Sequence, residues 1–128
     1  MLANFEVLQA KILVVDDLAA NVTLLERLLA NIGYQRVIST LDPTTVCALH
    51  REHHFDLILL DLQMPVMDGY AVMQALKDVE PESYTPVLVI TAQPAEKLRA
   101  LQAGAKDFVS KPFELVELQT RIANMLEV

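Results

Sequence analysis

The chain lacks several features that mark secreted, membrane-spanning and nucleic-acid-binding proteins. Its single cysteine, Cys47, excludes an internal disulfide and agrees with a reducing compartment. No apolar run approaches the roughly 20 residues of a membrane helix, so we expect no membrane association. Lys and Arg number only 10 against 17 Asp and Glu, which gives a formal net charge of -7. A general nucleic-acid binder normally has a basic face, so this composition argues against direct nucleic-acid binding.

The N-terminal residues also lack a targeting signal. Residues 1–10 have neither the positively charged start nor the long apolar stretch of a signal peptide, so we predict a cytoplasmic protein. We interpret residues 1–10 as an N-terminal leader packed loosely on the surface, and residues 11–128 as one domain. A chain of 128 residues, of which 53% are hydrophobic, can bury a core without disulfides or a structural metal.

Five short segments have the character of β-strands. Three of them, residues 11–15, 56–60 and 86–90, are apolar runs without alternation, which is typical of strands buried on both faces. Weaker candidates are residues 36–39 and 106–110. The three strong candidates indicate a sheet covered on both sides.

A helix is predicted after each of these strands. Amphipathic spacing, Asp and Pro at starts and Gly at ends predict helices over residues 21–32, 42–53, 68–78, 94–104 and from 112 onward. Gly33 is the expected C-terminal cap of the first helix, and Asp42 the N-cap of the second. Strict alternation of strand and helix predicts an α/β fold, a doubly wound parallel sheet with right-handed crossovers.

Polar residues follow four of the predicted strands at their carboxyl ends. Asp16 and Asp17 follow the first strand, Asp61 the third, Thr91 the fourth and Lys111 the fifth. In open α/β sheets, ligands bind outside the carboxyl ends of the strands. We therefore expect these side chains to meet in one pocket.

The residue types in this pocket suit a metal ion and a phosphoryl group. Three carboxylates brought together repel one another unless a cation is present, and Mg²⁺ (or Mn²⁺) prefers oxygen ligands. The backbone carbonyl of Gln63 is the expected further ligand beside Asp16, Asp17 and Asp61. An aspartate can act as a nucleophile, and Lys111 and the Thr91 hydroxyl could neutralise the phosphoryl oxygens.

The chain resembles the receiver domain of two-component response regulators, the CheY-like family. The resemblance covers about residues 11–128 and rests on motifs at residues 14–17, 60–69, 90–92, 104–108 and 111–113. It implies a flavodoxin-like (βα)5 fold with strand order 2-1-3-4-5. It also implies that Asp61 accepts a phosphoryl group from the phosphohistidine of a histidine kinase or phosphotransfer protein. Asp17 and Asp61 would bind the metal directly, and Asp16 mostly through a metal-bound water.

The same resemblance implies a conformational switch. The phosphoryl group draws the Thr91 hydroxyl inward, Ala92 lies beside the phosphate, and the Phe108 ring rotates into the space that Thr91 leaves. Lys111–Pro112 resembles the family's cis peptide. The switching face comprises the fourth helix, fifth strand and fifth helix, and would control an output domain or partner protein, or form a homodimer. The chain could be a stand-alone receiver that acts by binding a partner, or part of a longer regulator. We favour the second interpretation, since most receivers are joined to an output domain.

Two other functions compete with the phospho-receiver. A Mg²⁺-dependent phosphohydrolase of the haloacid-dehalogenase type places a second Asp two residues after its nucleophile, whereas this chain has Gln63, which cannot transfer protons. A docking-only pseudo-receiver would have lost part of the Asp, Thr and Lys set, and none is lost. We therefore expect no enzymatic activity beyond the domain's own phosphorylation and slow dephosphorylation.

Three histidines near the end of the second predicted helix suggest a separate metal site. His50, His53 and His54 are spaced so that two or three could share one face, with Glu52 and Cys47 near in sequence. We favour solvated histidines that interact with a helix C-terminus. Cys47 is expected to be a small buried apolar residue.

Overall fold

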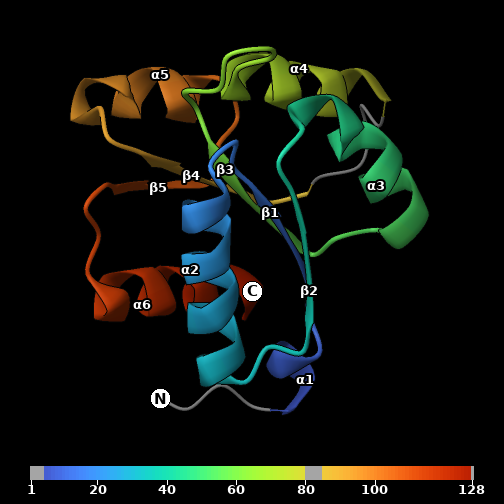
Figure 1. Ribbon diagram of the computed structural model, residues 1–128, viewed down its shortest axis with the longest axis vertical. Coiled ribbons are helices and arrows are strands. Elements are labelled where there is room, and N and C mark those ends of the chain that lie inside the picture. Colours follow the sequence, from blue (N-terminus) through green and yellow to red (C-terminus); the bar gives the residue numbers. More distant parts are fainter. Residues whose placement is uncertain (1–4, 80–84, 128) are drawn as a thin grey trace.

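A five-stranded parallel sheet forms the centre of the molecule (Figure 1). The computed structural model describes residues 5–79 and 85–127. The strands are β1 (Lys11–Val15), β2 (Arg36–Thr40), β3 (Leu57–Asp61), β4 (Val87–Thr91) and β5 (Asp107–Ser110). Their order is β2-β1-β3-β4-β5, and every pair is parallel. The predicted doubly wound α/β fold is confirmed.

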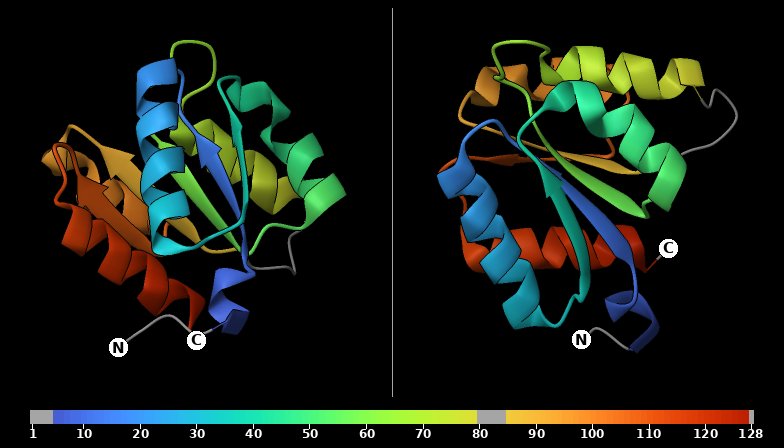
Figure 2. Two further views of the ribbon diagram at one scale, coloured as in Figure 1. Left: turned by 60° about the horizontal axis from the view of Figure 1, so that its bottom comes forward. Right: turned by 45° about the vertical axis from the view of Figure 1, so that its right-hand side comes forward.

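Helices cover both faces of this sheet (Figures 1 and 2). They are α1 (Phe5–Leu8), α2 (Ala19–Ile32), η1 (Pro43–Thr45), α3 (Val46–His53), α4 (Gly69–Val79), η2 (Pro94–Glu96), α5 (Lys97–Gln102) and α6 (Leu115–Leu126), where η marks a 3₁₀ turn. One core cluster joins the sheet to α1, α2 and α6, and the other joins it to α3, α4 and α5. The arrangement is three-layered, with the sheet between the two groups of helices.

Strand residues alternate between the two core clusters. In β1, Ile12 and Val14 pack with the α2–α6 side, whereas Leu13 and Val15 pack with the α3–α5 side. Each of these four side chains is buried. Burial on both faces is the physical reason why the strands appear in the sequence as unbroken apolar runs.

The N-terminal segment packs more tightly than the sequence predicts. Val7 of α1 is buried and belongs to the α2–α6 core cluster, and Ala10 is also buried. A Cβ at Gly33 would come within 3.2 Å of the Leu8 side chain, so Leu8 lies against the end of α2. The prediction of a loosely packed leader is therefore wrong for Val7, Leu8 and Ala10, while residues 1–4 lie outside the described part. The boundary of the domain at residue 11 stays a prediction.

Several element ends follow the predicted local signals. Gly33 caps α2 at φ 120°, and its backbone N–H donates to the carbonyls of Leu29 and Ala30. Asp42 accepts a 3.0 Å hydrogen bond from the Thr44 backbone N–H, as expected of an N-cap. The last helix starts later than predicted, at Leu115 instead of Pro112, because Glu114 is extended at φ -87° and ψ 140°.

Candidate functional site

Three carboxylates lie together where β1 and β3 end. Asp16 directly follows β1, Asp17 comes next, and Asp61 is the last residue of β3. One oxygen from each lies within 4.8 Å of the others. Asp16 is 1% exposed and Asp61 6% exposed. In residues 5–79 and 85–127, this is the only group of three or more Asp, Glu, His or Cys side chains arranged to hold a metal ion.

The Asp16 carboxylate is fixed by three donors. Its Oδ1 accepts from the Leu18 backbone N–H at 3.0 Å, and its Oδ2 accepts from Asn21 Nδ2 at 3.2 Å and from Lys111 Nζ at 3.2 Å. Asn21 lies on the first turn of α2 and was not among the site residues predicted from the sequence. These contacts hold an almost fully buried charge in one orientation.

Lys111, which directly follows β5, places a positive charge beside this group. Its backbone N–H donates to the Thr91 carbonyl at 2.8 Å, which continues the β4–β5 pairing by one residue. Its Nζ then lies 3.2 Å from Asp16 Oδ2 and 3.7 Å from Asp61 Oδ1. The Lys111–Pro112 peptide bond is cis.

Burial makes Asp61 a weaker acid than usual. Desolvation raises the pKa of Asp61 above its ordinary value, and the nearby Asp16 and Asp17 carboxylates raise it further. The Lys111 ammonium and the Gln63 backbone N–H oppose these effects and lower the pKa. The net shift is upward, so the charged form of Asp61 is destabilised.

This donor set fits a hard divalent cation. One ammonium group stands against three carboxylates, which leaves an excess of negative charge. Carboxylate oxygens are the ligands that Mg²⁺ and Mn²⁺ prefer. A cation at Asp16, Asp17 and Asp61 would offset the mutual repulsion of these carboxylates.

Thr91, the last residue of β4, is completely buried beside this group. Its hydroxyl donates a hydrogen bond to Oε1 of Gln63 and accepts one from the Gln93 backbone N–H at 3.3 Å. Gln63 was predicted to act only through its backbone carbonyl, so this side-chain contact with Thr91 is an addition from the structure. The next residue, Ala92, is exposed.

Phe108 lies in β5 and is also buried. It packs in the core cluster on the α3–α5 side of the sheet. The β4–β5 register pairs Phe108 with Val89, two residues before Thr91. The predicted switch residues Thr91 and Phe108 therefore lie on adjacent strands.

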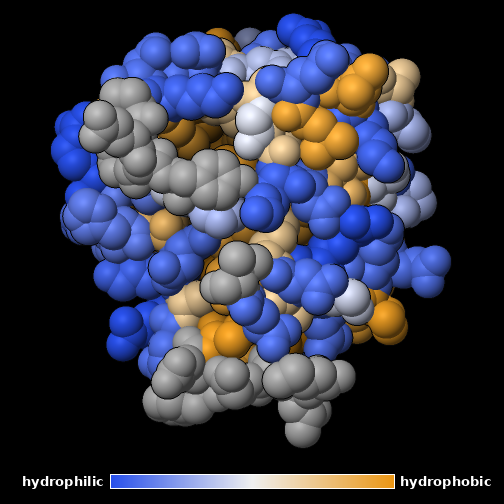
Figure 3. Space-filling view, turned by 180° about the vertical axis from the view of Figure 1, so that it is seen from behind, coloured by the Kyte–Doolittle hydropathy of each residue, from blue (hydrophilic) through white to orange (hydrophobic). Residues whose placement is uncertain are grey.

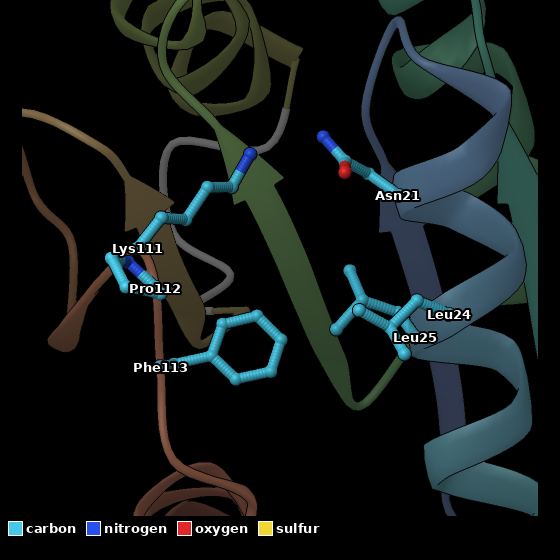
Figure 4. A pocket seen from close by; sticks show the side chains of 6 residues that line it. All are labelled: Asn21, Leu24, Leu25, Lys111, Pro112 and Phe113. Atoms are coloured by element: carbon cyan, nitrogen blue, oxygen red, sulfur yellow. The ribbon is translucent and has the colours of Figure 1, made fainter.

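A pocket of about 250 Å³ opens beside the acidic group (Figure 4). It is lined by residues of α2 and of the segment after β5: Asn21, Leu24, Leu25, Lys111, Pro112 and Phe113. In Figure 4, Lys111 and Asn21 extend toward one another from opposite sides. The polar ends of these two residues meet the acidic group at Asp16, while Leu25 and Phe113 give the pocket an apolar wall.

The three histidines do not form a metal site in the part of the chain that the structure describes. His50 is buried, its Nδ1 accepts from the Phe55 backbone N–H at 3.1 Å, and its Nε2 lies 2.9 Å from the Thr85 hydroxyl. The prediction of solvated histidines is therefore wrong for His50. Cys47, expected to be buried, is only half-buried.

Comparison with known proteins agrees with this geometry. The family model of the response regulator receiver domain matches residues 12–123. The chain belongs to the response regulator receiver domain family. A receiver domain is a signalling module of two-component systems, and such domains interact with histidine kinases and output domains.

Known relatives of this receiver domain include longer regulators. It is 40% identical over 120 residues to the response regulator PleD of Caulobacter vibrioides, which covers 92% of this chain and 26% of PleD. It is 40% identical over 118 residues to a probable transcriptional regulator, ycf27, of Porphyridium aerugineum, covering 91% of this chain and 48% of that protein. The chain therefore spans about a quarter to a half of these relatives.

Solved receiver structures have the same fold. The Vibrio cholerae chemotaxis protein CheY4 superposes with a TM-score of 0.82 at 28% identity, over 91% of this chain and 98% of that one. The receiver domain of the sensor histidine kinase PA1611 from Pseudomonas aeruginosa superposes with a TM-score of 0.84 at 30% identity, over 94% and 99% of the two chains. That structure has a magnesium ion coordinated in its active site cleft. In the described residues of this receiver domain, no helix is long and apolar enough to cross a membrane.

Proposed function

We propose that this receiver domain accepts a phosphoryl group on Asp61 in a Mg²⁺-dependent reaction. The observation that carries the proposal is the position of Asp61, which has an oxygen within 4.8 Å of two further carboxylates and lies 3.7 Å from the Lys111 ammonium. Asp61 thus lies beside carboxylates that can bind a divalent cation, and also beside the Lys111 ammonium. Phosphoryl transfer requires mainly this kind of positioning and charge neutralisation.

The metal ligands in this proposal are Asp17, Asp61 and the Gln63 carbonyl, with Asp16 acting mostly through a water. When bound, Mg²⁺ (or Mn²⁺) supplies neutralising positive charge for the phosphoryl oxygens. The chain's own residues orient the carboxylates. The Gln63 backbone N–H donates to Asp61 Oδ1 at 3.4 Å, and Asn21 and Leu18 hold Asp16.

The reaction transfers a phosphoryl group between two protein side chains. An Asp61 carboxylate oxygen attacks phosphorus, and a P–O bond forms as the P–N bond of a phosphohistidine breaks. The imidazole nitrogen of the donor keeps the bonding electron pair and is then protonated. Lys111 and the Thr91 hydroxyl contact the phosphoryl oxygens, with Ala92 lying beside them. The donor is a histidine kinase or a phosphotransfer protein.

The surface formed by α5, β5 and α6 changes on phosphorylation and transmits the signal to a partner. A phosphoryl group adds a charge of about -1.5 to -2 and strong acceptor oxygens, to which Thr91 and then Phe108 respond. Apolar side chains gather over α5 in the upper right of Figure 3, and the exposed ones on α5 and α6 are Leu98, Leu101, Leu115 and Val116. This surface suits an output domain, a partner protein or a second copy of the chain.

Gln63 supports a signalling role in preference to a phosphohydrolase. An amide has no group that ionises near neutral pH, so it cannot act as the general acid or base of fast turnover. Its side chain is in addition engaged with Thr91. We therefore expect the phosphoryl group to persist on Asp61 long enough to act as a signal in the cytoplasm.

Intact mass after incubation with Mg²⁺ and acetyl phosphate tests this proposal. We expect one added phosphoryl group in the wild-type protein, which disappears slowly and is lost when Mg²⁺ is chelated. Asp61→Asn should show none. Asp78→Asn, which changes an exposed carboxylate on α4, is the matched control and should be modified normally. Modification of Asp61→Asn, or rapid multiple turnover of the donor, would contradict the proposal.

A further inference from the structure

The Thr91 hydroxyl already donates its one hydrogen bond before any phosphoryl group arrives. It donates to Gln63 Oε1 and accepts from the Gln93 backbone N–H at 3.3 Å. A hydroxyl has a single proton to donate. A phosphoryl oxygen can only accept hydrogen bonds. It can therefore accept the hydrogen bond of the Thr91 hydroxyl only if Gln63 Oε1 no longer does.

We propose that the Gln63 side chain is a positioning residue that competes with the phosphoryl group for the Thr91 hydroxyl. Its amide oxygen stabilises the unphosphorylated arrangement and sets how strongly phosphorylation shifts the switch. The inference rests on the proposed phosphorylation of Asp61 and adds to it a residue that resists the change.

Gln63 contacts both the proposed nucleophile, Asp61, and the proposed switch residue, Thr91. Its backbone N–H donates to Asp61 Oδ1 at 3.4 Å, while its side chain reaches Thr91. The chain is anchored again a few residues later, where the Gly69 N–H donates to the Leu62 carbonyl at 3.1 Å. With the backbone fixed at both places, the side chain of Gln63 is the part that can release Thr91.

The burial of Thr91 gives this contact its importance. Thr91 is 0% exposed, so its hydroxyl cannot readily exchange a protein acceptor for bulk water. A buried donor without an acceptor is costly, which leaves two stable arrangements. In one arrangement, Gln63 Oε1 accepts the hydrogen bond from Thr91. In the other, a phosphoryl oxygen accepts it.

A second contact ties the same two segments together. The Tyr70 hydroxyl, one residue into α4, donates to Glu96 at the end of η2. The Arg99 guanidinium lies 3.9 Å from the centre of the Tyr70 ring, and its Nη1 lies 3.8 Å from Glu96. The end of β4 and the turn after it are thus bonded to the segment after β3 at both Thr91 and Glu96, and an inward movement of Thr91 has to act against these contacts.

Gln63 could instead act only as a support for its own loop. The two roles differ in their dependence on Thr91. A supporting residue would affect ligand binding whether or not residue 91 has a hydroxyl, whereas a competing acceptor has an effect only when that hydroxyl is present. A double-mutant cycle between the two positions therefore separates them.

The test uses beryllofluoride, a phosphoryl analogue, in saturating Mg²⁺, with affinity measured by calorimetry. Gln63→Met has nearly the shape of the wild type, retains the backbone carbonyl and removes the amide acceptor. Loss of one competing hydrogen bond should tighten binding of the analogue by about two- to tenfold. The same substitution in a Thr91→Val background should leave the affinity unchanged. Gln74→Met on the exposed face of α4 is the matched control and should also have no effect.

The outcomes distinguish this inference from the proposal on which it rests. If the wild-type protein binds no beryllofluoride in Mg²⁺, both are overturned. If it binds but Gln63→Met is unchanged or weaker, the phospho-receiver stands and the competing role of Gln63 is wrong. An equal effect of Gln63→Met with threonine and with valine at position 91 would assign Gln63 to loop support alone.

Discussion

Lys111 Nζ lies 3.2 Å from the Asp16 carboxylate, nearer than the 3.7 Å that separates it from Asp61. The lysine therefore pairs mainly with a carboxylate of the proposed metal site and only secondarily with the proposed nucleophile. A divalent cation and the Lys111 ammonium would compete for the negative charge of Asp16. Binding of the cation would weaken the ion pair between Asp16 and Lys111. The Lys111 ammonium could then contact a phosphoryl oxygen.

Lys111→Met should strengthen Mg²⁺ binding while impairing phosphorylation. Removing a positive charge a few ångströms from the cation should lower the dissociation constant for Mg²⁺ by roughly three- to tenfold at low salt. The amount of phosphoryl-Asp61 at a fixed donor concentration should fall, because the phosphoryl oxygens lose a counter-charge. Calorimetry and intact mass measure the two effects. Lys97→Met, at an exposed lysine on α5, should change neither. Weaker Mg²⁺ binding in Lys111→Met would contradict the competition.

Asp61→Asn should stabilise the metal-free protein. The pKa of Asp61 is raised in the folded state above its ordinary value of 3.8, chiefly by burial. The folded state therefore holds this proton more tightly than the unfolded state, and the stability of the wild type falls as pH rises through the folded pKa. At neutral pH, we expect Asp61→Asn to raise the thermal midpoint by a few degrees.

The gain from Asp61→Asn should depend on pH and on metal. It should shrink toward acid pH, where the wild-type carboxyl is protonated, and in millimolar Mg²⁺, which stabilises only the wild type effectively. Thermal denaturation across pH, with and without chelator, gives both dependences. Asp78→Asn controls for the loss of one surface charge. A lower midpoint for metal-free Asp61→Asn at neutral pH would show that the charge of Asp61 is stabilising.

Tyr70→Phe should remove a tyrosine that ionises near pH 12. Burial and the hydrogen bond to Glu96 raise the pKa of Tyr70 from 10.0 to about 12. The folded state retains the phenolic proton, so the contribution of Tyr70 to stability is complete below pH 10 and is lost as pH rises from 10 toward 12. Ultraviolet absorbance of tyrosinate in wild type and variant identifies the group. At neutral pH, the variant should lose about 0.5–1.5 kcal/mol of unfolding free energy. Titration of Tyr70 near pH 10 would contradict the hydrogen bond.

Gly69→Ala should disturb the segment that carries Gln63. A Cβ at position 69 would lie 2.6 Å from Leu62 Cδ2 and 2.9 Å from the Asp61 carbonyl oxygen. The Leu62 side chain can move, but the Asp61 backbone is part of β3 and cannot. We expect a loss of about 1–3 kcal/mol in denaturant unfolding and slower phosphorylation by acetyl phosphate. Ala71→Ser, at an exposed position of the same helix, should be nearly neutral in both assays. A fully active Gly69→Ala would mean that the loop adapts freely.

The sheet and the acidic group could be predicted because their signals are local. Strands buried on both faces give unbroken apolar runs, and parallel strands bring their carboxyl ends to one edge, so Asp16, Asp61 and Lys111 had to lie close together. The strand boundary at Asp61 was less visible. The strand is predicted over 56–60, but Asp61 pairs with Ile90 in the ladder. Hydropathy does not reveal a polar residue that continues a strand.

The contacts that the sequence could not reveal join residues far apart in the chain. Gln63 and Thr91 are separated by 28 residues, and Tyr70 and Glu96 by 26. One of the partners of the buried His50 ring is the Thr85 hydroxyl, 35 residues away. Helical spacing places His50 near a helix end, but only the packed fold determines which side chain faces it. Such pairings depend on rotamers and loop paths that no periodicity records.

The position of β5 at the margin of the sheet has a consequence for amide hydrogen exchange. Among the described strands, β1 and β3 are each bonded to a strand on both sides, whereas β5 is bonded only to β4. The carboxylates thus stand on the part of the sheet that opens least often, and Phe108 stands on a strand that can detach with the loss of one ladder. Amide protons of β1 and β3 should exchange with solvent most slowly, and those of β5 sooner. The domain would then combine a rigid reaction centre on β1 and β3 with a more mobile strand, β5, whose movement can respond to phosphorylation.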